Sequence, residues 1–306
     1  MAEQITQVGQ IPSIEKKVSA RAISQAQRRR QLRRGSESIG AHVIMIITVL
    51  VCLLPLLILI STSFKPAIDT FDRLLIPAHP TLDNYKYVLT FNNNIFVTWL
   101  LNSLKIGVMT TVIGLALSSP AAYAFSRWNF LGKQGILLSF LITQMFPGII
   151  LLIPLFRLFA GLNLTDNIYG LVIAYATTAL PFSVWMLKNF FDAVPKELDE
   201  AAHVDGLGPF QTFWRIVLPL TIPGVAVVGF FNFMAAWNEF LMAFTFLQSD
   251  SNLTLPIGIQ RFVFQTGADW QYLTAASVLV TIPVLIIFIW AQRYLISGLT
   301  GGSVKG

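Results

Sequence analysis

Six long apolar runs, almost free of charge, constrain the fold of this chain more than any other feature. They cover about residues 39–63, 99–126, 135–157, 168–190, 220–247 and 272–297. A helix needs roughly 20 apolar residues to cross the hydrocarbon core of a bilayer, and every run is long enough. Lipid offers the backbone no hydrogen bonds, so each crossing segment has to be helical. We therefore predict an all-α integral membrane protein with six transmembrane helices.

The composition agrees with this class. Hydrophobic residues make up 55% of the 306 residues and charged residues 12%, whereas a soluble domain usually carries about 25% charged residues. Prolines interrupt the runs at Pro55, Pro120, Pro147, Pro154, Pro181 and Pro283. Membrane helices tolerate proline where neighbouring groups satisfy the freed carbonyl, so we expect kinked helices packed in a bundle.

Lysine and arginine predict the orientation, because they concentrate in loops that stay in the cytoplasm. One side of the six-span arrangement holds fifteen of them and the other five, with Lys105 left inside the second run. The fifteen are Lys16, Lys17, Arg21, Arg28, Arg29, Arg30, Arg33, Arg34, Arg127, Lys133, Lys188, Lys196, Arg215, Arg293 and Lys305. We expect both termini in the cytoplasm and no cleavable leader in the polar, basic first forty residues.

Three parts follow from this arrangement: a basic N-terminal tail (1–38), a six-span domain (39–297) and a C-terminal tail (298–306). The basic run Arg28-Arg29-Arg30 could also bind nucleic acid or anionic lipid. Directly before a first span, such a run is typical of a topology signal. We therefore expect no nucleic-acid function.

Small residues recur along the second run at Gly107, Thr111, Gly114 and Ser118. Spacings of four, three and four place them on one face of a helix. Such a face lets a neighbouring helix approach closely. We interpret it as a packing seam.

The loop at about 188–219 is polar yet contains helix signals. Glu197, Asp199 and Glu200 suit the first turn of a helix, where the helix dipole favours acids, and Pro195 suits a first-turn position. Gly206 and Gly208 then break the helix and Pro209 can start a second one. Ala201 and Ala202 would give a small face. This hairpin is either a docking element for a partner or an interfacial helix without one.

One spaced pattern in this loop resembles the EAA loop of ATP-binding-cassette importer permeases. The pattern is Glu-Ala-Ala, three residues, Gly, nine residues, Ile, one residue and Leu-Pro. Its fixed positions fall on Glu200, Ala201, Ala202, Gly206, Ile216, Leu218 and Pro219.

Three further stretches carry the resemblance over nearly the whole chain. Residues 121–127 (AAYAFSR) resemble the family's Ala-Tyr-Ala-Phe-Ala-Arg stretch, and 236–240 (AWNEF) is a common form in carbohydrate permeases. The Gly-rich end, 298–306, resembles the tail of the maltose-type second permease, which reaches between the ATPase subunits.

The resemblance implies a permease subunit of a sugar importer in the bacterial inner membrane. Its loop would be the coupling helix that docks in a groove of an ATPase subunit. The implied partners are two ATPase subunits, a second paralogous permease and an external solute-binding protein. ATP and Mg²⁺ would be used by the ATPase partner.

No site for chemistry is evident in the chain itself. A phosphate-binding loop needs G-x-x-x-x-G-K-[ST], but Arg127 stands at the first glycine position before Gly132-Lys133, and Gln134 follows. The single cysteine, Cys52, and three separated histidines form no metal-ligand pattern. We therefore expect a transport subunit that binds no cofactor, holds no metal and has no catalytic residues.

Polar residues inside the apolar runs are the candidates for a substrate pathway. Glu239 is the only acid inside a run, and an ionisable group at membrane depth is a functional candidate by default. Amide and aromatic groups suit sugar hydroxyls and ring faces. The candidates are Asn232, Trp237, Asn238, Glu239, Gln144 and Tyr175.

Two other classes of membrane protein compete with this interpretation. Ion-coupled transporters and channels usually bury several ionisable groups, whereas this chain buries Glu239 and Lys105 at most. A membrane enzyme would need a catalytic dyad or a metal cluster, and the sequence shows neither.

Overall fold

The structure is a computed structural model that describes residues 40–266 and 269–301. The chain divides into two units between Leu59 and Ile60, and each is described by itself. The described part of the first unit, residues 40–59, belongs to a helix that spans Gly40–Ser63. Large apolar side chains on this helix are exposed, as expected of a segment that faces lipid or another helix.

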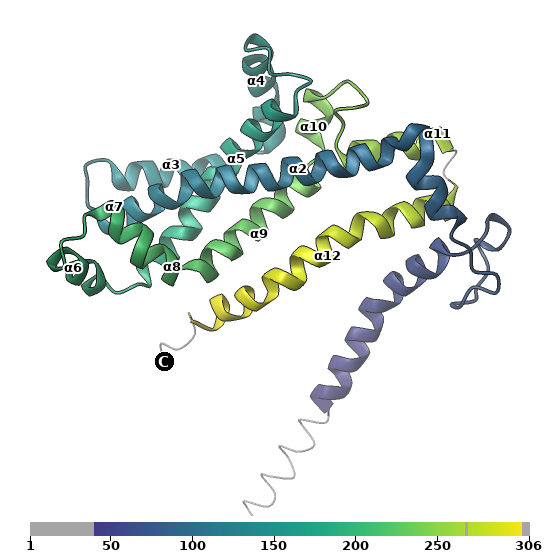
Figure 1. Ribbon diagram of the computed structural model, residues 1–306, viewed down its shortest axis with the longest axis horizontal. Coiled ribbons are helices and arrows are strands. Elements are labelled where there is room, and N and C mark those ends of the chain that lie inside the picture. The colour runs from purple at the N-terminus through teal and green to yellow at the C-terminus, as the bar shows by residue number, and fades with distance from the viewer. Residues whose placement is uncertain (1–39, 267–268, 302–306) are drawn as a thin grey trace, which may run out of the picture. The chain divides into compact units, whose positions relative to one another are not determined.

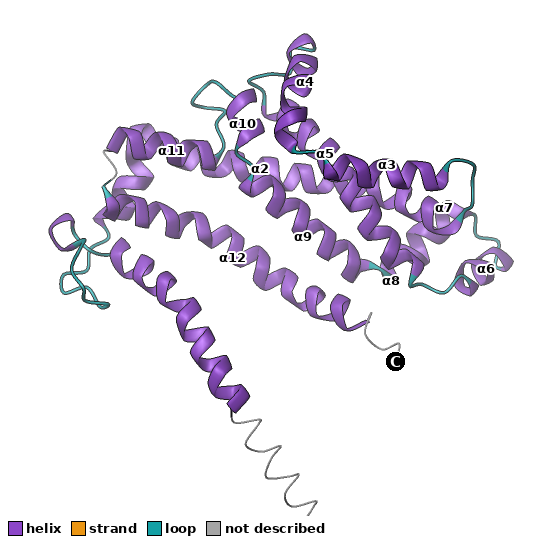
Figure 2. Cartoon of the chain, turned by 180° about the vertical axis from the view of Figure 1, so that it is seen from behind, coloured by secondary structure: helices purple, strands orange, loops and turns teal. Residues whose placement is uncertain are grey.

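Helices are the regular secondary structure of the second unit's described residues, and no strand occurs in them (Figure 2). The elements are η1 (Ala67–Asp69), α2 (Asp83–Arg127), α3 (Lys133–Met145), α4 (Gly148–Gly161), α5 (Ile168–Asp192), α6 (Glu197–Val204), α7 (Pro209–Thr212), η2 (Phe213–Val217), α8 (Leu218–Leu220), α9 (Ile222–Asn238), α10 (Leu241–Phe246), α11 (Leu255–Thr266) and α12 (Trp270–Gly301). The backbone of the predicted C-terminal tail is thus helical as far as Gly301, while 1–38 and 302–306 lie outside the described residues.

The described helices provide four to six candidate spans, which agrees with the six predicted. Four of them are long and apolar enough to cross a membrane, and two bent pairs bring the number to six if each pair is one span. The prolines at 55, 120, 154, 181 and 283 lie inside continuous helices. Only Pro147 coincides with a break.

The third span is not the continuous helix that the apolar run 135–157 predicts. It breaks after Met145 into α3 and α4, which are bent by 103°. Phe146 is extended at the break (φ −74°, ψ 132°), because a residue before proline is disfavoured in the helical region. Apolar composition alone does not reveal this bend.

The fifth span is also shorter than the predicted 220–247. An 80° bend separates the Pro209–Leu220 stretch from α9, and α9 ends at Asn238. Glu239 is extended (φ −72°, ψ 129°), and α10 begins two residues later. α9 alone therefore begins two residues later than the predicted run and ends nine residues earlier.

The second span begins earlier than the predicted residue 99. Helical residues run from Asp83, with non-helical backbone at Phe91 and at the three asparagines that follow it. Asn92, Asn93 and Asn94 all have positive φ, a conformation that asparagine tolerates better than most residues.

α2 is the central helix of the second unit and packs against α5, α9 and α12 (Figure 1). The predicted small-residue seam lies on it. An added Cβ at Gly107 would meet the Phe233 ring of α9 at 2.8 Å, and one at Gly114 would meet the Asn232 amide at 3.2 Å. The prediction of a close helix–helix approach is therefore confirmed.

Two apolar cores lie along this bundle. One gathers around Trp99, Leu171 and Phe246, and the other around Tyr123, Phe191 and Phe213, beside the 188–219 loop. In Figure 1, α6 and α7 lie at one end of the unit and α11 at the other. We call α6, α7 and α8 the hairpin end, and we call residues 162–167 and 247–254, which follow α4 and α10, the loop end.

The loop end is held together by one carboxylate. The backbone N–H groups of Gln248 and Ser249 donate to Asp166 Oδ1, each at 3.0 Å, and the Ser249 hydroxyl donates to Oδ2. Asn252 Nδ2 donates to the Asp166 backbone carbonyl at 2.7 Å and to the carboxylate Oδ1 at 3.3 Å. Partial burial raises the pKa of Asp166, but these hydrogen bonds outweigh it and lower the pKa from 3.8 to about 2.

α2 holds the same loop from the other side. Trp99 Nε1 donates to the Asp250 carbonyl at 2.8 Å, and Asn102 Nδ2 donates to the carbonyls of Ser251 and Leu253 at 2.8 and 3.0 Å. All three acceptors are backbone carbonyls, so these contacts fix the path of the chain. The loop end is therefore fastened to both α2 and the start of α5.

The packing seam predicts a contrast between two glycines. Alanine at an exposed helical glycine stabilises by up to about 1 kcal/mol, and Gly135 on α3 has open space around it. At Gly107 the stabilisation by alanine is opposed by overpacking of the new methyl group against Phe233, which typically costs about 1–3 kcal/mol. Gly107→Ala should therefore melt at a lower temperature than Gly135→Ala in detergent. Equal melting temperatures would contradict the seam.

The Asp166 contacts predict faster local opening in Asp166→Asn. Asparagine keeps the left-handed backbone (φ +51°) but loses the charge, so the amides of Gln248 and Ser249 should exchange hydrogen faster. Amides of α3 serve as the internal control. Because the folded pKa lies below 3.8, the stabilisation by the wild-type carboxylate is complete above that pH and is lost as the pH falls through about 2. Protection that disappears between pH 7 and pH 5 would refute this assignment.

Candidate functional site

The 188–219 loop forms the predicted helix, glycine break and second helix. Three acids occupy the first turn of α6, as predicted. Gly206 follows with φ +82°, a conformation that glycine adopts without a steric penalty. Pro209 opens α7. Pro195 is outside α6, because the helix begins at Glu197 with Lys196 as its N-cap, so the predicted first-turn place for Pro195 is wrong.

The residues of the EAA-like pattern divide between the surface and the interior. Glu200, Ala201 and Gly206 are exposed, whereas Ala202 is only 2% exposed and packs inward. The expected small face of two alanines is therefore reduced to Ala201. Ile216 and Leu218 are half-buried and Pro219 is exposed. A partner could reach Glu200, Ala201 and Gly206 directly.

An ion pair that the sequence interpretation missed holds this hairpin against the bundle. Arg127, the last residue of α2, lies with its Nε 2.9 Å from Asp199 Oδ2 of α6. Tyr123 Oη, one turn earlier on α2, donates to Asp199 Oδ1 at 2.7 Å. The Tyr-x-x-x-Arg spacing inside residues 121–127 could have indicated this contact, because residues i and i+4 share a helix face and can bind the same partner.

A cleft of about 250 Å³ lies between the end of α2 and the hairpin. Its lining mixes both charges with aromatic and small residues. The lining residues are Tyr123, Arg127, Trp128, Lys196, Asp199, Glu200, His203, Pro209 and Thr212. The exposed carboxylate of Glu200 lies at its rim, so the hairpin presents an acid beside a recess.

Within the spans, the structure brings Tyr175 and Glu239 into contact. Tyr175 Oη donates to Glu239 Oε2 at 2.5 Å. The same carboxylate accepts the backbone N–H groups of Met242 at 2.8 Å and Ala243 at 3.1 Å. Glu239 therefore caps the start of α10 at the break in the fifth span, which satisfies donors that lipid could not.

A second polar residue of the fifth span meets α5 deeper in the bundle. Asn232 is 2% exposed, and its Oδ1 accepts from Ser183 Oγ at 3.0 Å. Trp237 is 4% exposed and stacks on Phe233 with ring centroids 5.5 Å apart. Both side chains are enclosed by protein, so neither faces an open path in this conformation.

Gln144 and Asn238 are the exposed members of the candidate set. Gln144 Nε2 lies 3.4 Å from the carbonyl of Thr178 on α5, and Thr178 Oγ1 donates to the Tyr175 carbonyl. The same turn of α5 thus meets the end of α3 and, through Tyr175, the end of α9. Three helices expose amide and hydroxyl groups near two helix breaks.

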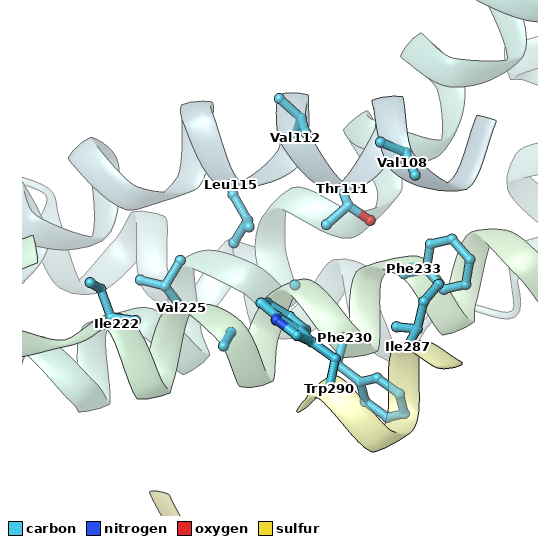
Figure 3. A pocket seen from close by; sticks show the side chains of 12 residues that line it. Val108, Thr111, Val112, Leu115, Ile222, Val225, Phe230, Phe233, Ile287 and Trp290 are labelled. Carbon is cyan, nitrogen blue, oxygen red and sulfur yellow. The ribbon is translucent and has the colours of Figure 1, made fainter. Parts of the chain in front are cut away.

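A separate groove of about 360 Å³ lies among α2, α9 and α12 (Figure 3). Thr111 and Trp290 are the only residues in its lining with side-chain hydrogen-bonding atoms, and the Thr111 hydroxyl already donates to the Gly107 carbonyl at 2.7 Å. Figure 3 shows aromatic rings of Phe230, Phe233 and Trp290 around it. A sugar needs several polar partners, so this groove suits apolar chains and no sugar.

Comparison with known proteins gives the family and the fold. Residues 114–301 match the family described as binding-protein-dependent transport system inner membrane component. A solved bacterial ABC transporter involved in the import of the acidic polysaccharide alginate has a chain that aligns with a TM-score of 0.74 and 24% identity. The alignment covers 84% of this chain and 95% of that one, and it shows the shared fold.

Curated relatives match over most of their length. The inner membrane ABC transporter permease protein YcjP of Escherichia coli (strain K12) is 38% identical over 278 residues, covering 90% of this chain and 99% of YcjP. The trehalose transport system permease protein SugB of Mycobacterium tuberculosis (strain CDC 1551 / Oshkosh) is 37% identical over 83% of this chain and 93% of SugB. The maltose/maltodextrin transport system permease protein MalG of Vibrio parahaemolyticus is 35% identical over 87% and 95%.

The predicted resemblance to importer permeases is confirmed by these matches, which cover both the spans and the 188–219 loop. The chain belongs to the family of inner membrane components of binding-protein-dependent transport systems.

Proposed function

We propose that this chain is one permease subunit of an ATP-driven importer for a sugar or sugar-like solute, and that α6 docks on an ATPase partner. The observation that carries the proposal is the hairpin itself: Glu200, Ala201 and Gly206 are exposed on a short helix that an ion pair fastens to α2. A surface that is both open and firmly attached is suited to receive force from a partner. The relatives that transport trehalose and maltodextrins support a sugar as cargo.

The orientation follows from the basic residues. We place the hairpin end and both termini in the cytoplasm, because Arg127, Lys133, Lys188, Lys196 and Arg215 surround this end. The loop end then faces outward, where a solute-binding protein would deliver the solute. A second, paralogous permease would complete the pathway across the membrane.

The mechanism has two states that differ in which side opens. ATP and Mg²⁺, bound by two ATPase subunits, bring those subunits together and draw this hairpin toward its counterpart on the second permease. The spans then rock and exchange inward for outward access. Coupling requires that ATP and the loaded binding protein favour the same state. The relatives give no support to the ion-coupled alternative.

The solute pathway is proposed at the turn of α5 where α3 and α9 end. Tyr175 and Glu239 brace this region, while Gln144 and Asn238 are open to solvent or solute. Asn232 and Trp237 would join the pathway only if the spans separate, because both are buried here.

The docking role predicts loss of transport from surface changes in the hairpin. Glu200→Lys reverses the charge offered to the ATPase, and Gly206→Pro cannot adopt φ +82°, since proline is fixed near −65°. Both variants should reach the membrane, fail to copurify with the ATPase and abolish uptake. Gly208→Ala is the control, because Gly208 has φ −74° and open space around its Cα. Normal uptake by Glu200→Lys and Gly206→Pro would refute docking.

The pathway predicts weaker solute capture when an exposed amide is lost. One hydrogen bond is worth about 0.5–1.5 kcal/mol. Gln144→Ala and Asn238→Ala should each raise the half-saturating solute concentration for uptake into proteoliposomes by about 2–10-fold. Ser139→Ala on α3 is the control, because its hydroxyl only bonds the Ile136 carbonyl. Unchanged saturation in both amide variants would move the pathway elsewhere.

A further inference from the structure

One arginine joins three helices at the hairpin end. The Arg127 side chain is only 6% exposed, and its Nε lies 2.9 Å from Asp199 Oδ2 of α6. Its Nη1 donates to the Phe191 carbonyl at 3.1 Å, and its Nη2 donates to the Val194 carbonyl at 3.2 Å. The guanidinium therefore links the end of α2, the end of α5 and the first turn of α6.

The contacts to α5 are those of a helix C-terminal cap. The last carbonyls of a helix have no partner within the helix, and a cation beside them is favoured by the helix dipole. Ser126 adds a second link, because its hydroxyl donates to Asp192 Oδ1 at 2.6 Å. The ends of α2 and α5 are thus fastened to each other by two consecutive residues.

Asp199 is held by α2 through both of its oxygens. Oδ2 faces Arg127, and Oδ1 accepts from Tyr123 Oη at 2.7 Å. The Tyr123 ring also packs against Phe213 of η2, with centroids 5.1 Å apart. α6 and η2 therefore both contact the last two turns of α2.

A lysine could not replace this arginine. The guanidinium presents donors in a planar fork, whereas an ammonium is a compact charge on a flexible stem. Asp199 and the carbonyls of Phe191 and Val194 each contact a different nitrogen of the guanidinium, so a single ammonium would satisfy only part of the set. Removing either charged partner would also leave the other buried without compensation.

We propose that Arg127 and Asp199, with Tyr123, are positioning residues that make α6 move as one body with α2 and α5. This inference rests on the proposed docking of α6 on an ATPase. It specifies that a displacement of α6 is passed to α2 and α5. We call Arg127, Asp199 and Tyr123 the clamp. α2 extends from the clamp to Trp99 and Asn102, which hold the 247–254 loop. A displacement of the hairpin would thus be delivered to the loop end along one helix.

The test separates coupling from docking in the whole transporter. The complete complex, with the ATPase, the second permease and the binding protein of its own system, is reconstituted in proteoliposomes, and both uptake and ATP hydrolysis are measured. Arg127→Lys and Asp199→Asn should still copurify with the ATPase, while solute transported per ATP hydrolysed falls about tenfold. Lys133→Ala is the control, since Lys133 contacts only Trp128 and Asn129 beside the same helix end.

Distances between spin labels supply a readout that a purely structural role would not change. Labels at Leu198→Cys on α6, which is exposed and is not one of the proposed docking residues, and at Asn129→Cys beyond α2 are introduced with Cys52→Ser, because Cys52 is the only native cysteine. With the clamp intact, the distance distribution should stay narrow and unchanged by ATP. Arg127→Lys should broaden it.

The outcomes distinguish the two proposals. Unchanged transport per ATP in both clamp variants, or an ATP-dependent change of the native distance, overturns the clamp. Loss of assembly in both clamp variants also overturns it, because the pair would then serve folding alone. If Glu200→Lys still copurifies with the ATPase and transports normally, the docking proposal fails instead.

Discussion

A backbone inside lipid must find its own hydrogen-bond partners, and several helix ends in this bundle find them in side chains. Glu239 accepts the first N–H groups of α10 where the fifth span is interrupted. Arg127 donates to the carbonyl of Phe191 in the last turn of α5 and to that of Val194 just beyond it, where the chain leaves for the hairpin. Asp166 accepts hydrogen bonds from two backbone N–H groups of the 247–254 loop. Three charged side chains of this apolar chain thus provide hydrogen-bond partners where helices or loops need them.

The same arrangement separates parts that can move from parts that cannot. The bends of 103° and 80° separate helical segments, so in the proposed mechanism a change of access can be absorbed at these joints while the helices stay intact. The contacts of Arg127 at the hairpin end and the hydrogen bonds of Trp99 and Asn102 at the loop end fasten both ends of the part of α2 that follows its break at 91–94. In the proposed mechanism, a displacement of the hairpin end is therefore passed to the loop end through α2 rather than absorbed by local rearrangement.

The sequence predicted the helices because the bilayer leaves one solution for an apolar run of about 20 residues. It also predicted the hairpin, since Gly206 and Pro209 have strong local preferences. It did not predict the break at Glu239, because an acid in an apolar run can equally line a pathway or cap a helix. It missed Arg127 as well: a basic residue after a span looks like a topology signal until Asp199, distant in sequence, is seen beside it. Contacts between remote residues carry no local pattern.

Because α2 is long, the thickness of the surrounding bilayer should affect how far the helix tilts. From Ile95 to Arg127 the helix extends roughly 50 Å at 1.5 Å per residue, whereas the hydrocarbon core is about 30 Å thick. A rod of that length protrudes into the headgroups or leans, and the lean depends on how thick the lipid layer is. Longer acyl chains would bring α2 more upright and raise the surface formed by 247–254 relative to the hairpin. Lipid thickness would then tune transport without touching any residue that binds solute or nucleotide.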